Sequence, residues 1–173
     1  MGDRVAVLKD GYLQQVDTPR NLYDKPDNIF VAGFIGSPAM NLVEVDLDRD
    51  GAVLGNHSFP LPRQTMAALA ADKSSTATLG FRPESVQLVG EGEGYPFEVV
   101  VVEELGSDAY AYGTLHTSRS QGGDKLLTLR VDARRPPMKG ETVHITINPD
   151  EAYVFASGSG RRVSGDVADV AQA

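Results

Sequence analysis

The sequence predicts a mainly β protein, built as an antiparallel barrel or sandwich and preceded by a short segment of a different kind. Three observations support this prediction. After residue 41, short runs of β-branched and other apolar residues recur at close spacing, separated by turns that contain Gly or Pro. That part of the sequence holds a single segment that favours a helix, residues 63–71. Before residue 41, the pattern instead predicts one hairpin and two short helices.

The segment before residue 41 is defined by its turn and helix-start signals. Two apolar runs flank a Lys-Asp-Gly turn, which predicts a β-hairpin over residues 5–16. Thr18, followed by Pro, predicts the start of a first helix, and Asn28 predicts the start of a second. These elements are too small to fold alone. We expect a partly ordered arm on which Phe30 and Phe34 leave an exposed apolar patch.

Ten short strands are predicted after this segment, with the helix between the third and the fourth. They cover 42–47, 52–54, 58–61, 76–81, 85–89, 97–104, 109–116, 126–131, 142–147 and 152–155. This number of strands fits an antiparallel barrel of the OB type. Small and polar residues prevail after residue 156, which predicts a disordered tail. The sequence therefore divides into a leading segment, 1–41, a β domain, 42–156, and a tail, 157–173.

Composition excludes several classes of protein. The 173 residues contain no Cys, so neither a disulfide nor a thiolate metal site can form. No run approaches the roughly 20 apolar residues of a membrane-spanning helix, and no signal peptide opens the chain, which predicts a cytoplasmic protein. Lys and Arg number 16 against 24 Asp and Glu, a net charge of −8. An acidic chain with few aromatic residues is poorly suited to bind nucleic acid.

The leading segment also resembles a known family. It reads DRVAVLKDG, LQQVDTPRNLYDKP and NIFVAGFIGSPAMN. This run is similar to the end of the ATPase domain in MalK-like subunits, the ATP-binding subunits of sugar-importing ABC transporters. The resemblance implies that the chain is the C-terminal part of a larger ATPase, with the catalytic histidine lying before Met1.

Three later motifs resemble the transport-associated OB (TOBE) domain of the same family. LGFRPE at 79–84 is similar to its signature, and VEELG at 102–106 to its turn before the next strand. GETV at 140–143, with PDE at 149–151, is similar to its closing strands. All the motifs follow the family's order. The resemblance implies an OB-type barrel that contacts its twin in the ATPase dimer.

Candidate interface residues follow from these motifs. Arg82 and Glu84 lie two residues apart, so both side chains can point to one face of an extended segment. They can pair with each other, as a turn-stabilising ion pair, or with an opposite subunit. Gly106 is expected to permit a tight turn. We expect Arg82, Glu84 and the turn formed by Leu105, Gly106 and Asp108 to lie near a dimer or regulatory surface.

The sequence predicts no catalytic, cofactor or metal site in this chain. A phosphate-binding P-loop needs G-x-x-x-x-G-K-[ST], which does not occur. GEGEG at 90–94 carries two carboxylates and no Lys, and SGSGRR at 157–162 precedes no helix. His57, His116 and His144 lack metal-ligand spacing. By the resemblance, ATP and Mg²⁺ belong to the ATPase domain of the parent subunit.

The resulting prediction is a regulatory and dimerisation domain without ATPase activity of its own. Its expected partners are a second copy, permease subunits reached through the ATPase domain, and a regulatory protein, at the inner face of the membrane. The alternative is a small-ligand sensor for an oxyanion or sugar phosphate. In that reading, Lys73 and the Ser-Ser-Thr run at 74–76 supply the site.

Overall fold

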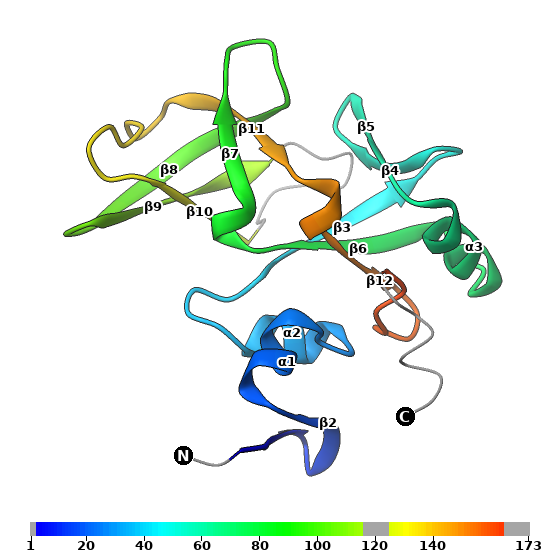
Figure 1. Ribbon diagram of the computed structural model, residues 1–173. Coiled ribbons are helices and arrows are strands. Elements are labelled where there is room, and N and C mark those ends of the chain that lie inside the picture. Colours follow the sequence, from blue (N-terminus) through cyan, green and yellow to red (C-terminus); the bar gives the residue numbers. More distant parts are fainter. Residues whose placement is uncertain (1–2, 116–124, 165–173) are drawn as a thin grey trace.

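The computed structural model describes residues 3–115 and 125–164. The chain begins with a two-stranded hairpin, β1 (Val5–Lys9) and β2 (Tyr12–Asp17), followed by α1 (Pro19–Asp24) and α2 (Ile29–Phe34). Thr18 and Asn28 cap the two helices by accepting hydrogen bonds from Asn21 N and Val31 N, so both predicted helix starts are confirmed. Figure 1 shows these four elements together below a larger β module.

The β module consists of two five-stranded antiparallel sheets. The first has the order β10-β9-β8-β11-β7, and the second has the order β12-β6-β3-β4-β5. The strands of the first sheet are β7 (Val86–Val89), β8 (Tyr95–Leu105), β9 (Asp108–Leu115), β10 (Leu127–Asp132) and β11 (Thr142–Ile147). Those of the second are β3 (Asn41–Leu47), β4 (Gly51–Leu54), β5 (His57–Pro60), β6 (Thr76–Phe81) and β12 (Tyr153–Ala156), with α3 (Arg63–Ala71) joining β5 to β6.

The mainly β class with antiparallel sheets is confirmed, and the described strands form two five-stranded sheets rather than one closed barrel. The chain passes between the sheets twice after β5, from β6 to β7 and from β11 to β12. Each passage runs through a short 3₁₀ turn, η1 (Pro83–Ser85) or η2 (Pro149–Glu151). Proline has no N–H to continue a strand ladder, so both turns end one sheet before the next begins.

The hydrophobic core lies between the two sheets. Alternate residues of β9 are buried, as expected for a strand with one face toward the core. The largest fully buried side chains of this cluster come from both sheets and from α3: Phe59, Phe81, Phe97, Leu54, Leu69, Leu79, Leu129 and Ile145. A smaller cluster of Val7, Leu22 and Val31 holds the hairpin and the two helices together.

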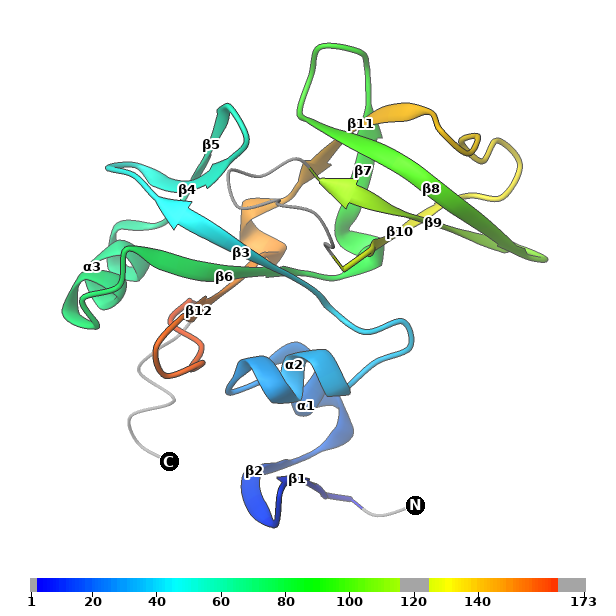
Figure 2. The same cartoon turned by 180° about the vertical axis from the view of Figure 1, so that it is seen from behind.

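The segment 157–164 is folded, so the expected disorder from residue 157 is wrong there. Its backbone pairs with the leading segment, since Ile29 N donates to Gly160 O at 2.9 Å and Arg162 N donates to Asp27 O at 2.9 Å. Ser164 is buried and its hydroxyl accepts from Val154 N at 2.9 Å. Figure 2, the view from behind, likewise places this segment between β12 and the two N-terminal helices. Residues 165–173, and His116, lie outside the described residues.

Candidate functional site: the junction of the N-terminal helices with the β module

Arg82 is the central residue of the junction. It follows β6 and precedes η1, and only 4% of its surface is exposed. Its Nη1 donates to the carbonyl oxygen of Ile35 at 2.8 Å, and its Nη2 donates to that of Tyr23 at 2.7 Å. Ile35 is the C-cap of α2, and Tyr23 lies in the last turn of α1. One side chain of the β module therefore binds the C-terminal ends of both helices, where the carbonyl groups carry partial negative charge.

The electrostatics of Arg82 follow from its burial. Burial lowers the pKa of the Arg82 guanidinium, while the nearby Tyr23, Tyr153, Glu84 and Asp24 act in the opposite direction. The carbon of the guanidinium lies 3.9 Å from the centre of the Tyr23 ring, so the positive charge faces the electron-rich face of an aromatic group. Within the described part of the chain, the buried Nε has no hydrogen-bond partner. The cation is thus held by two carbonyls and one ring.

Tyr23 extends the junction toward Glu84. Its hydroxyl donates a hydrogen bond to Glu84 Oε1. Burial, followed by this hydrogen bond and the charge of Glu84, raises the pKa of Tyr23 to about 12. The phenol therefore stays protonated and remains a donor at neutral pH.

The other predicted interface residues lie on the first sheet. Asp108 accepts from Arg130 Nε at 3.2 Å and from Arg130 Nη2 at 2.7 Å, and Arg130 also lies within the electrostatic reach of Glu84. Leu105 and Gly106 form the tip of the β8–β9 hairpin; Leu105 is 54% exposed and Gly106 has a φ of +73°. Asp108 is therefore paired with Arg130 within the first sheet. Arg82, in contrast, is buried and uses both Nη groups inside its own chain.

Two further side chains, which sequence reasoning did not select, cross the same junction. The Tyr153 hydroxyl on β12 donates to Asp24 O at 2.8 Å, and Arg162 Nε donates to Pro26 O at 3.0 Å. Both acceptors are backbone carbonyls at the end of α1 or just after it. Every residue has a backbone carbonyl group, so the type of a residue does not indicate whether its carbonyl accepts such a bond. The sequence therefore gives no signal for these contacts.

Two residues of the alternative oxyanion site, Ser74 and Thr76, hydrogen-bond to side chains outside that site. Ser74 Oγ donates to Asp72 Oδ2 at 2.7 Å, and Thr76 Oγ1 is 2.9 Å from Ser157 Oγ. The Asp72 carboxylate would repel a bound anion at this position. Among the described residues, no group of three His, Asp or Glu side chains is arranged to hold a metal ion. In the same part of the chain, no helix has the length and apolarity that crossing a membrane requires.

Comparison with known proteins identifies two domains. Residues 36–86 match the MalK OB fold domain, and residues 79–155 match the TOBE domain. The two matches overlap at the segment that contains Arg82 and Glu84.

Relatives that are similar over nearly the whole chain are ATP-binding proteins of uptake or import systems. A diacetylchitobiose uptake system ATP-binding protein of Streptomyces coelicolor is 48% identical over 95% of this chain and 47% of its own length. An sn-glycerol-3-phosphate import ATP-binding protein of Paracoccus denitrificans is 34% identical over 95% of this chain and 44% of its own length. An osmoprotective compounds uptake ATP-binding protein of Synechocystis is 36% identical over 90% of this chain and 43% of its own length. The chain thus spans a little under half the length of these relatives.

Proposed function

Because the chain belongs to the MalK-like family of ABC-transporter ATP-binding subunits and carries its C-terminal OB and TOBE domains, we propose that it regulates and dimerises such a subunit. The parent subunit imports a carbohydrate or a related small polar solute. Its expected partners are a second copy of the chain, the permease subunits and, through the β module, a regulatory protein. The complex works at the inner face of the cell membrane.

The Arg82 contact is the observation that supports this proposal best. By the resemblance, α1 and α2 close the ATPase domain, whereas Arg82 belongs to the TOBE signature. A buried guanidinium that binds the ends of both helices fixes the β module to them. When two β modules associate, the two attached ATPase domains stay close while they open and close on ATP. Any partner that prefers one of these arrangements shifts the equilibrium by its difference in affinity.

Sedimentation equilibrium of the chain over a wide concentration range tests the dimerisation. A dimer has twice the 18.5 kDa mass of the chain. We expect reversible association toward that mass as concentration rises; a constant monomer mass would refute dimerisation through this domain. An ATP-hydrolysis assay on the same samples should give no turnover above buffer, since the proposal assigns the nucleotide site to the ATPase domain of the parent.

A further inference from the structure

A cavity of about 400 Å³ lies beside the Arg82 junction. Three parts of the chain line it: the end of α1, residues 59–62 at and just after the end of β5, and a C-terminal part made of residues 149–154, Arg162 and Ser164. Its volume lies within the range of about 300–1,000 Å³ that is usual for small-molecule sites. The cavity is therefore large enough for a ligand, and both the leading segment and the β module contribute to it.

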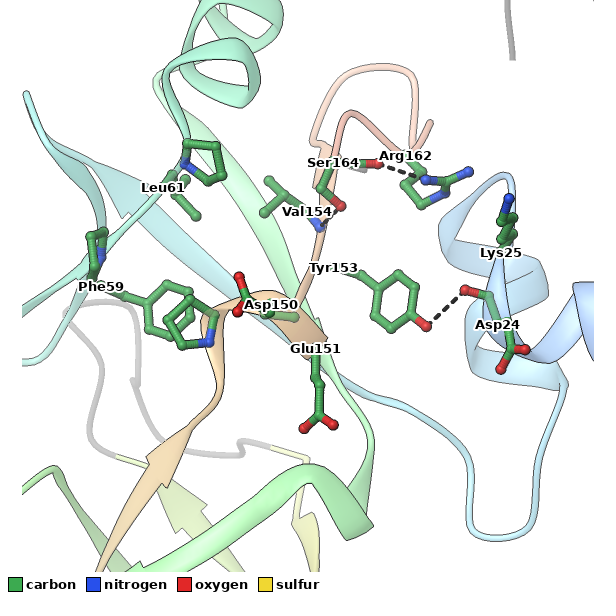
Figure 3. Close-up of a pocket in the computed structure, with 14 residues that line it drawn as sticks. Asp24, Lys25, Phe59, Leu61, Asp150, Glu151, Tyr153, Val154, Arg162 and Ser164 are labelled. Atoms are coloured by element: carbon green, nitrogen blue, oxygen red, sulfur yellow. Dashed lines mark hydrogen bonds between the residues drawn. The ribbon is translucent and has the colours of Figure 1, made fainter. Parts of the chain in front are cut away.

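One wall of the cavity is apolar and rigid. Pro60 and Pro62 follow Phe59, and Pro149 opens η2 on the adjacent side. Proline rings present C–H groups and no N–H donor, and their backbone has little freedom to collapse into the space. Figure 3 shows Phe59 and Leu61 on this side of the cavity. Such a wall suits the C–H face of a ligand rather than its polar groups.

The rest of the lining carries polar groups of both signs. Asp150 and Glu151 supply carboxylates, and Lys25 and Arg162 supply cations, whereas the carboxylate of Asp24 is paired with Arg20 Nε at 3.3 Å. In Figure 3, Asp150 lies between Phe59 and Tyr153, whereas Arg162 and Lys25 lie beyond Tyr153. Like charges repel, so the carboxylates disfavour a small anion and the two cations disfavour a small cation. A hydroxyl group both donates and accepts, so it can satisfy either kind of side chain.

We propose that this cavity binds a neutral polyhydroxylated molecule of monosaccharide or disaccharide size, with its C–H face on the proline wall and its hydroxyls on Asp150 and Arg162. The leading segment, which lines the cavity with Asp24 and Lys25, is already joined to the β module by the contacts from Tyr153 to Asp24 O and from Arg162 to Pro26 O. A ligand that fills the cavity and reaches Asp24 and Lys25 stabilises this association, because it binds the docked arrangement and not the separated one. The cavity is thus a regulatory site at the junction. The binding claim itself does not depend on the proposed function.

Titration of the isotopically labelled chain, followed by amide NMR, tests this inference. The probes are glucose, maltose and trehalose, with glucose 6-phosphate as the anionic control and glucosamine as the cationic control. We expect saturable shifts at residues 59–62, 149–154 and 162–164 with at least one neutral sugar, and at least tenfold weaker binding of its charged counterpart. Absence of saturable shifts with all three neutral sugars, or equal binding of the charged probes, overturns the proposal.

Two substitutions at one exposed position locate the site. Asp150→Ala removes an acceptor, and Asp150→Tyr narrows the cavity; neither disturbs the core, since Asp150 is exposed. Each should weaken sugar binding at least tenfold. Glu91→Ala, an exposed carboxylate in the loop between β7 and β8, is the matched control and should leave the affinity unchanged. Unchanged binding by both Asp150 variants would assign any sugar affinity to another surface and refute the cavity as the site.

Discussion

Arg82 and Tyr23 contact each other twice, through the guanidinium over the phenol ring and through a hydrogen bond from Nη2 to the Tyr23 carbonyl oxygen. The two residues are 59 positions apart in sequence. The contact therefore joins the end of α1 to the end of β6, which are parts of the chain that local propensity cannot relate. It also explains why an arginine is buried here: its charge is in direct contact with two carbonyl dipoles and an aromatic face, and the carboxylates of Glu84 and Asp24 lie nearby.

The first prediction concerns substitution of Arg82. Arg82→Ala leaves the carbonyl oxygens of Tyr23 and Ile35 without their donor and removes the side chain from beneath the Tyr23 ring. Losing these contacts should lower the free energy of unfolding by about 2–4 kcal/mol. Arg82→Lys keeps the charge but cannot form the two-pronged contact, so about 1–2 kcal/mol should be lost. Urea denaturation measures both values.

Arg135→Ala is the control for this series, because Arg135 is an exposed arginine in the loop after β10. It should change the free energy of unfolding by less than about 0.5 kcal/mol. If Arg82→Ala behaves like this control, the junction contributes nothing to stability and the proposed attachment through Arg82 is wrong.

The second prediction concerns alkaline pH. The folded protein holds the pKa of Tyr23 at about 12, above the ordinary value of 10. Between these two values the unfolded chain loses its proton first, so the folded state binds more protons and stability falls as pH rises. The contribution of Tyr23 is complete below pH 10 and disappears as the pH passes 12. The Tyr23 contribution to the free energy of unfolding, measured at pH 8, 10 and 11, should therefore be nearly constant from pH 8 to pH 10 and decline from pH 10 to pH 11.

Tyr23→Phe should reduce that decline, since it removes the titrating group. Tyr12→Phe is the matched control, because Tyr12 is 75% exposed on the hairpin. It should leave the pH dependence as in the unsubstituted chain. Equal slopes for the unsubstituted chain and Tyr23→Phe would show that folding does not raise the pKa of Tyr23, and would contradict the buried contact described here.

Local signals in the sequence were sufficient for the elements but not for their assembly. Thr18 and Asn28 correctly marked two helix starts because capping acts within three residues. The choice between barrel and sandwich could not be made from local signals, because sheet closure depends on which distant strands pair; here Pro83 and Pro149 end the ladders between the two sheets. Disorder from residue 157 was wrong up to residue 164 because the backbone partners of that segment lie at residues 27–29.

In the candidate site, too, local sequence signals did not show which distant residues come into contact. The sequence selected Arg82 and Glu84 by motif and predicted that both can point to one face of an extended segment, near a dimer or regulatory surface. The structure leaves Glu84 exposed and buries Arg82, because the partners of Arg82 are carbonyl groups of residues 23 and 35. Whether Leu105 and its turn contact a second subunit is still a prediction.

The third prediction concerns Gly113 in β9. A Cβ atom there would lie 2.0 Å from the carbonyl oxygen of Glu98 and 2.6 Å from a ring atom of Phe97. The obstacle includes backbone of the neighbouring strand, which cannot move aside without disturbing the β8–β9 ladder. Gly113→Ala should therefore cost more than about 2 kcal/mol of stability or prevent folding. Circular dichroism shows whether the variant folds, and its thermal unfolding, compared with that of the unsubstituted chain, shows how much stability is lost.

Gly90→Ala is a suitable control for Gly113, because the nearest atom to its added Cβ is 3.8 Å away, on a Glu93 side chain. Its melting temperature should stay close to that of the unsubstituted chain. A melting temperature for Gly113→Ala equal to that of Gly90→Ala would mean that β8 and β9 do not pack as closely as described.

The fourth prediction tests the β8–β9 tip as part of a dimer surface. Leu105 is 54% exposed, so Leu105→Asp removes no core contact and should change the free energy of unfolding by less than about 0.5 kcal/mol. If the tip lies at the subunit interface, a carboxylate placed there must be desolvated, which weakens association at least tenfold in sedimentation equilibrium. Leu88→Asp is the control, since Leu88 is a leucine of similar exposure, 45%, on β7 at the edge of the same sheet. Equal effects of the two substitutions on association would exclude the tip as a specific contact and move the dimer surface elsewhere on the β module.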